Sequence, residues 1–203
     1  MTQAPLASQA TDTRLAILTS ALACFRSYGL HKTTIVDIVR TAGVSRSTFY
    51  EYFRDKASVV EACAESTTQR FYRNMAKAMD RGGSLEDKLC RAAVFVTQAR
   101  QFVEPEKYFD HEEVVLLLTK NAAILLQECS DFLSPYLAAA KVTGEVRKDL
   151  DIQTAGEWFA RMLFSLFNTP SPNLDLHDPA AVDSFVRAHV MRGFVDERTA
   201  RPK

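Results

Sequence analysis

Residues 43–53, with the sequence GVSRSTFYEYF, place hydrogen-bonding side chains beside a dense set of aromatic rings. Arg46 carries a planar guanidinium with several donors, and Ser45, Ser47 and Thr48 surround it with hydroxyl groups. A guanidinium can form two parallel hydrogen bonds to a matching pair of acceptors. The stretch therefore combines packing groups with exposed donors. Its rings are Phe49, Tyr50, Tyr52 and Phe53.

The residues before this stretch predict two helices and a tight turn. Apolar residues at helical spacing indicate a first helix over about residues 12–28, which Gly29 ends. A second helix begins at Thr34, because Thr34 and Asp37 have the spacing of a capping box. Gly43 then supplies the positive φ that a turn after a helix needs.

A third, short helix is predicted to follow this turn. Ser45 is a suitable N-cap, and Val44 can pack against Phe49 as a hydrophobic staple. This register turns Phe49 and Phe53 inward and leaves the polar side chains and both tyrosines wholly or partly exposed. Asp55 is placed to cap the next helix, which runs to about residue 80.

Two short helices joined by a glycine turn are typical of a helix-turn-helix, whose second helix can enter the major groove of B-DNA. There Arg46 can donate to guanine O6 and N7, and Ser47 or Thr48 can bond to a base or a phosphate. Residues 1–56 carry a net charge of +3 against −3 in the remainder, which favours a polyanion at this end. Taken alone, the stretch also suits a core segment with a polar edge.

The block TTIVDIVRTAGVSRSTFYEYFRDKASVVEAC resembles the TetR family of bacterial transcriptional regulators, specifically over about residues 14–62. Two residues depart from the family pattern. Ser47 replaces a frequent glycine, and Glu51 introduces an acid that either weakens affinity for the DNA backbone or selects a cytosine. The resemblance implies that Thr33 and Thr34 contact phosphates, that Arg46, Ser47 and Thr48 read the groove, and that Tyr50, Tyr52 and Lys56 clamp the backbone.

The helical patterns and the absence of any segment with strand periodicity predict an all-α fold of about nine helices. We expect a disordered arm over residues 1–11, a helix-turn-helix domain over 12–56, a helical effector-binding and dimerisation domain over 57–197, and a tail over 198–203.

The last two long helices carry apolar surfaces that could meet the same helices of a second chain in a four-helix bundle. The later one begins with Asp178 as cap and Pro179 at its first position. The alternative is that both helices are core helices of a monomer. The predicted dimer interface consists of Phe159, Leu163, Leu166, Val182, Phe185, Val186 and Val190.

Rings and thioethers dominate the helices that the family wraps around its ligand, although each of these residues also suits a plain core. They favour an apolar or aromatic effector, including one with an acyl chain, over a sugar or a metal. The predicted pocket residues are Phe71, Met75, Phe95, Phe102, Tyr108, Phe109, Leu118, Trp158 and Met162.

The sequence predicts no catalytic or metal site and no cofactor. HEEVV, at 111–115, lacks the second histidine of the H-E-x-x-H zinc motif, and no Walker, GxSxG or GxGxxG motif occurs. The four cysteines form no CxxC pair and suit buried thiols in a reducing cytoplasm. No apolar run is long enough to span a membrane, and the first residues lack a signal-peptide pattern.

We therefore expect a cytoplasmic, homodimeric repressor that binds a palindromic DNA operator and is released by a small effector. One alternative is a helical ligand-binding protein or enzyme with an inert head. The other is a DNA-binding regulator that has no effector.

Overall fold

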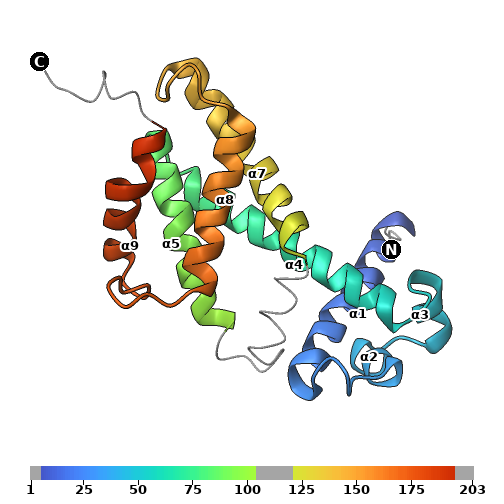
Figure 1. Cartoon of the computed structure of the whole chain (residues 1–203). Helices are drawn as coiled ribbons and strands as arrows, with labels where there is room; N and C mark the ends of the chain where they lie inside the picture. Colours follow the sequence, from blue (N-terminus) through green and yellow to red (C-terminus); the bar gives the residue numbers. More distant parts are fainter. Residues whose placement is uncertain (1–5, 104–120, 195–203) are drawn as a thin grey trace, which may run out of the picture. The chain divides into compact units, whose positions relative to one another are not determined.

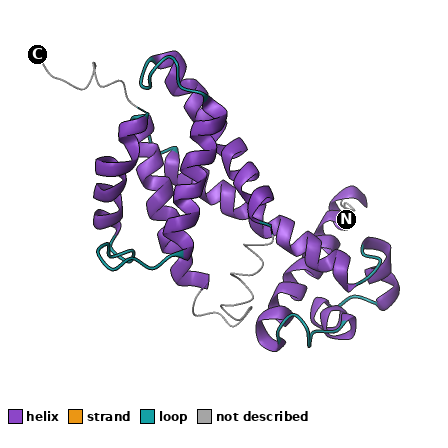
Figure 2. Cartoon of the chain, in the orientation of Figure 1, coloured by secondary structure: helices purple, strands orange, loops and turns teal. Residues whose placement is uncertain are grey.

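The computed structural model describes residues 6–103 and 121–194 (Figure 1). Over these residues the chain forms eight α-helices, one π-helical and one 3-10 segment, and no strand (Figure 2). The predicted all-α class is confirmed. The described residues divide into two compact units, residues 6–71 and residues 72–103 with 121–194, here called the first and the second unit. Of the residues predicted from the sequence, Tyr108, Phe109 and Leu118 lie outside the described part.

The first unit contains α1 (Leu6–Tyr28), α2 (Ile35–Ala42), α3 (Arg46–Tyr52) and the part of α4 (Lys56–Met79) that ends at Phe71. Helix α1 begins before residue 12, where the sequence predicted its start. It therefore includes residues 6–11, which we expected in a disordered arm. These residues contain no glycine or proline, so their sequence does not oppose a helix.

The predicted caps of α2 are confirmed. The Asp37 backbone N–H donates to the Thr34 hydroxyl at 3.3 Å, and the Thr34 N–H donates to the Asp37 carboxylate at 3.0 Å. Gly43 ends the helix with a φ of 66°, in the left-handed region where glycine is favoured. The chain can therefore reverse sharply before α3.

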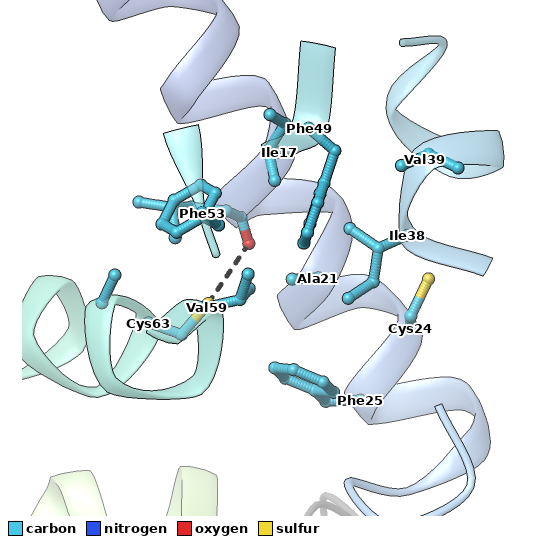
Figure 3. Packing of buried hydrophobic residues seen from close by; sticks show 12 residues of the cluster. Ile17, Ala21, Cys24, Phe25, Ile38, Val39, Phe49, Phe53, Val59 and Cys63 are labelled. Carbon is cyan, nitrogen blue, oxygen red and sulfur yellow. Dashed lines mark hydrogen bonds between the residues drawn. The ribbon is translucent and has the colours of Figure 1, made fainter. Parts of the chain in front are cut away.

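Phe49 lies at the centre of the core of the first unit (Figure 3). It is fully buried, and Ile17 of α1, Ile38 of α2 and Val59 of α4 belong to the same buried cluster. Phe53 is buried there as well, and Val44 packs against the cluster, as expected for a staple residue. The buried face of α3 is thereby fixed, which sets the direction of its exposed face.

The cysteines of the described chain are free and buried. The Cys63 thiol donates to the Leu18 carbonyl oxygen at 3.7 Å, the contact drawn as a dashed line in Figure 3. Burial raises the pKa of Cys63 to about 11 and the pKa of Cys90 and Cys129 to about 12. These three thiols are therefore protonated at neutral pH.

The second unit holds the rest of α4 together with α5 (Leu85–Val103), α7 (Ala122–Thr143), α8 (Ile152–Asn168), α9 (Pro179–Phe185), η1 (Val186–Val190) and η2 (Met191–Gly193). Helix α7 packs against α8, and α9 and η1 pack against α5. The α7–α8 contact is close, because a Cβ atom added to Gly156 would lie 2.7 Å from the Ser130 hydroxyl oxygen. No helix in the described ranges is long and apolar enough to cross a membrane.

The last helix differs from the prediction of one regular α-helix. Asp178 caps α9 and Pro179 occupies its start, as predicted, but the chain changes to a π-helix at Val186 and to a 3-10 turn at Met191. Arg187, inside the π-helical segment, donates to Asp183 at 2.7 Å and to Asp87 of α5 at 2.8 Å. The bond to Asp87 ties the segment to the start of α5, and the bond to Asp183 joins it to α9.

Candidate nucleic-acid interface

Helix α3 begins with a formed N-cap. The Ser45 hydroxyl accepts the Thr48 backbone N–H at 3.0 Å, as the sequence predicted. With Phe49 buried, the helix turns Arg46, Ser47, Tyr50 and Glu51 to its exposed side. We call these four residues the outward face of α3. They include one cation, one anion, one hydroxyl and one phenol ring, and no aliphatic side chain.

The hydroxyl groups at the start of α3 contact one another. Ser45 Oγ lies 2.7 Å from Ser47 Oγ and 2.9 Å from Thr48 Oγ1. Each hydroxyl has one donor and two acceptor positions, so the shared bonds leave capacity for a further partner. Thr48 is half-buried and Ser47 is exposed, so Ser47 is the better placed of the two to meet a base edge.

Arg46 is exposed and makes no ion pair or hydrogen bond with any residue in the described part of the chain. Its guanidinium is therefore available for two parallel bonds to an outside acceptor pair. Guanine presents such a pair, O6 and N7, in the major groove. Arg46 is the residue of this face whose chemistry fits base recognition best.

The three residues predicted to clamp the DNA backbone, Tyr50, Tyr52 and Lys56, contact other residues of their own chain. Tyr50 is 49% exposed, and its ring meets the Phe49 ring edge-on with the centroids 5.5 Å apart. Tyr52 is half-buried and packs against the core of the first unit. The Lys56 ammonium donates to the His31 carbonyl oxygen at 3.2 Å, and this bond fixes the place of its charge beside the loop before α2.

The two threonines predicted to contact phosphates lie in different surroundings. Thr33 is only 1% exposed, and its hydroxyl donates to the Gly29 carbonyl oxygen at 2.8 Å. In this conformation Thr33 presents no hydroxyl to a phosphate. Thr34 is exposed, but its hydroxyl donates to the Asp37 carboxylate at 2.6 Å. The sequence pattern could not distinguish this capping role from a phosphate contact.

Sequence reasoning missed an exposed cation of α2 as a candidate site residue. Arg40 lies in the last turn of α2, and its guanidinium contacts the Asp37 carboxylate at 3.0 Å while remaining 69% exposed. The bonds from Thr34 lower the pKa of Asp37, and Arg40 adds to that effect. Asp37 is thus charged at neutral pH. Its carboxylate accepts hydrogen bonds from Thr34 at the cap and pairs with the Arg40 guanidinium. The sequence did contain a signal for Arg40. It is a basic residue in the last turn of the predicted helix, before Gly43.

The predicted pocket residues whose side chains are described differ in their exposure. Met75 is fully buried, Met162, Phe71 and Phe95 are half-buried, and Trp158 is 42% exposed. The Trp158 ring lies 5.6 Å from the Phe194 ring and lines a hollow of about 260 Å³ that is open to one side. The side chain of Phe102 lies outside the described part.

Most of the predicted dimer residues pack inside their own chain. Phe185 is half-buried, its ring centroid 5.2 Å from that of His189, and the side chain of Val190 is not among those described. The exposed side of α8 consists of other residues, which include Glu157, Trp158 and Arg161. The predicted residues with 6% exposure or less are Phe159, Leu163, Leu166, Val182 and Val186.

Two short helices joined at a left-handed glycine, with an exposed arginine at the start of the second, define a helix-turn-helix DNA-binding protein. Residues 17–63 match the family model described as bacterial regulatory proteins, tetR family. This match and the helix-turn-helix geometry assign residues 17–63 to the DNA-binding segment of the TetR family of transcriptional regulators.

Similar proteins extend this likeness over most of the chain. The HTH-type transcriptional regulator YdgC of Bacillus subtilis (strain 168), described as uncharacterised, is 26% identical over 161 residues, which cover 77% of this chain and 80% of YdgC. A TetR-family regulator from Pectobacterium atrosepticum has the same fold, with a TM-score of 0.66 at 16% identity over 97% of this chain and 98% of its own. FadR from Bacillus subtilis, solved with stearoyl-CoA, has a TM-score of 0.57 at 18% identity over 85% of this chain and 96% of its own.

Proposed function

We propose that this regulator is a homodimeric repressor that acts in the cytoplasm. It binds a palindromic operator and leaves it when a small apolar molecule binds. We assign DNA binding to residues 12–56 and effector binding and dimerisation to residues 57–197. The observation that carries the proposal is the outward face of α3, where Arg46 has no partner within the described residues. The free, buried cysteines are compatible with a reducing compartment.

The operator is tested by selecting binding sequences from random duplexes with the full-length protein. A dimer that presents two α3 helices should return two half-sites related by a two-fold axis, with their centres roughly 34–36 Å or a multiple of that apart. Selection of a single half-site would contradict a symmetric dimer on DNA. Failure to enrich any sequence would contradict the repressor proposal itself.

The dimer contact is proposed on the exposed side of α8 and on Phe185. Trp158 supplies a large apolar group there, and the Glu157–Arg161 pair, 2.6 Å apart, borders it. Trp158→Glu should give monomers, because an unpaired charge inside an interface is strongly unfavourable. Phe185→Asp should act in the same way.

Light scattering on these variants measures the oligomeric state directly. Val142→Glu is the matched control, because Val142 is an apolar residue of α7 that is 88% exposed. The control should remain dimeric with unchanged helical content. If Trp158→Glu and Phe185→Asp were both as dimeric as the control, the interface would lie elsewhere.

The effector is proposed to be apolar or aromatic, with an acyl chain as one option. Support comes from the buried or half-buried Met75 and Met162 of the second unit and from the stearoyl-CoA bound by the FadR structure. Effector binding would favour a dimer whose two α3 helices no longer fit successive major grooves. Typical coupling energies then predict a loss of operator affinity of roughly 5–150-fold.

The effector proposal is tested by calorimetric titration of fatty acids, acyl thioesters and planar aromatic compounds, with and without operator. By linkage, operator must lower the affinity for a releasing compound by the same factor by which the compound lowers operator affinity. A compound that binds free and DNA-bound protein equally is not the releasing effector. If every compound that binds does so equally, the protein is a regulator without effector-driven release by these classes.

A further inference from the structure

Glu51 places an uncompensated carboxylate on the outward face of α3. Its side chain is exposed and forms no ion pair or hydrogen bond within the described chain. The two cations that follow it in sequence have other partners. Arg54 contacts Asp55 at 3.3 Å, and Lys56 donates to the His31 carbonyl oxygen. If α3 meets DNA, neither Arg54 nor Lys56 therefore neutralises the charge of the Glu51 carboxylate.

Helical spacing places Glu51 beside the groups that would read bases. Ser47 and Glu51 are four positions apart, so they lie on the same side of α3, one above the other. Four residues at 1.5 Å each separate them by about 6 Å along the helix. That distance is close to two base-pair steps at about 3.4 Å each. Buried Phe49 keeps this side of the helix turned away from the protein.

The chemistry of the major groove restricts what can face this carboxylate. A phosphate repels it, and guanine and thymine present acceptors that also disfavour it. Cytosine presents the N4 amino donor, to which aspartate or glutamate can accept a hydrogen bond. Adenine also offers an amino donor, but its N7 acceptor adjoins that donor and would face the second carboxylate oxygen. The order of preference is therefore cytosine, then adenine, then thymine and guanine.

We propose that Glu51 determines operator specificity by accepting a hydrogen bond from cytosine N4, about two base pairs from the position that Ser47 meets. This inference rests on the proposed insertion of α3 into the major groove. Glu51 would thus require a particular base at a position other than the one that Arg46 reads. Each half-site should hold one position where cytosine is required for full affinity.

The experiment is selection from random duplexes with wild-type protein, Glu51→Gln and Glu51→Ala, followed by affinity measurements on single-base variants of the wild-type consensus. Replacing the required cytosine should weaken wild-type binding about 5- to 150-fold. Glutamine forms paired hydrogen bonds with adenine, so Glu51→Gln should move the preference at that position from cytosine to adenine. Glu51→Ala should bind all four bases there with similar affinity.

Glu61→Gln is the matched control, because Glu61 is an exposed acid of the same unit and its replacement changes net charge equally. It should leave the consensus unchanged. If Glu51→Gln instead keeps the wild-type consensus and tightens binding to every sequence by one factor, Glu51 only repels phosphates and the inference is overturned. If wild-type protein enriches no sequence, α3 does not read DNA, and that separate result removes the proposed function itself.

Discussion

The Thr33 hydroxyl donates a hydrogen bond of 2.8 Å to the carbonyl oxygen of Gly29, and the Thr33 backbone N–H donates to the same oxygen at 3.2 Å. Gly29 has a φ of 83°, so it is the residue at which the chain leaves α1. The two bonds close the loop that leads into α2. Thr33 thus holds the loop between α1 and the Thr34 cap of α2.

Thr33→Val should therefore destabilise the protein without removing a DNA contact. The variant loses one buried hydrogen bond and leaves the valine in a site shaped for a hydroxyl, for a loss of about 1 kcal/mol in unfolding free energy. Urea denaturation measures that loss. Operator affinity should be unchanged. An equal loss of affinity for all sequences, at wild-type stability, would show that Thr33 contacts a phosphate after all.

Arg46→Ala should weaken operator binding by about 1–3 kcal/mol and relax the preference at one base position. The reason is that its free guanidinium is the best fit on α3 to the guanine acceptor pair. Fluorescence anisotropy on consensus and single-base variants measures both effects. Arg81→Ala, which removes an exposed arginine of the second unit, is the control and should bind as wild type does. An unchanged consensus from Arg46→Ala would exclude base reading by this residue.

Lys56→Ala should weaken binding evenly across sequences. Its ammonium is held against the His31 carbonyl oxygen, where it can meet a phosphate but offers no geometry for base choice. Loss of one phosphate contact should reduce the salt slope by about one. Anisotropy at several salt concentrations, on consensus and scrambled duplexes, tests this. Lys148→Ala, in the second unit, should leave the slope unaltered, and a sequence-dependent loss from Lys56→Ala would contradict the phosphate role.

The ion pair between Arg187 and Asp87 should make stability depend on acid pH. The bond from Arg187, with those from Ser84, holds the pKa of the Asp87 carboxyl below its usual range. A carboxyl whose folded pKa is depressed stabilises the fold above its unfolded value of about 3.9, and loses that effect as pH falls through the folded pKa. Both side chains are more than a third exposed, so screening limits the contribution to about 1 kcal/mol.

Asp87→Asn should accordingly lower the unfolding free energy by about 1 kcal/mol at pH 7 and match wild type once the pH lies below the folded pKa. Urea denaturation at a series of pH values between these limits measures how the unfolding free energy of each protein depends on pH. Asp12→Asn, at an exposed acid that forms no bond with any described residue, should follow wild type throughout. A deficit of Asp87→Asn that persisted undiminished into acid would mean that packing, and not charge, explains it.

The positions where helices start could be predicted from single residues. Thr34 with Asp37, Ser45, Asp151 and Asp178 all accept the backbone N–H groups that helix starts leave unpaired. These signals depend on neighbours within three positions, so the sequence contains them in full. The inward turn of Phe49 follows from the same register. The outward face of α3 was predictable for this reason.

Tertiary burial could not be predicted in the same way. Helix α8 is apolar over much of its surface, and the sequence does not say whether a ring such as Phe159 meets its own chain or another. In the structure Phe159 is buried and Trp158, the adjacent residue, is exposed. Thr33 shows the same ambiguity, because a hydroxyl near a helix start can serve a phosphate or a carbonyl oxygen of its own chain.

The π-helical segment Val186–Val190 gives the end of the chain a particular tolerance to changes in length. A π turn closes over one residue more than an α turn, so deletion of one residue within it would leave ordinary α-helical bonding. Because the shorter α turn goes about as far around the helix axis as the π turn, the residues that follow would keep nearly the same direction. Phe194 would then keep its place 5.6 Å from the Trp158 ring and 6.4 Å from the Phe159 ring. Related chains that lack this residue should therefore carry the same aromatic one position nearer to the start of α9.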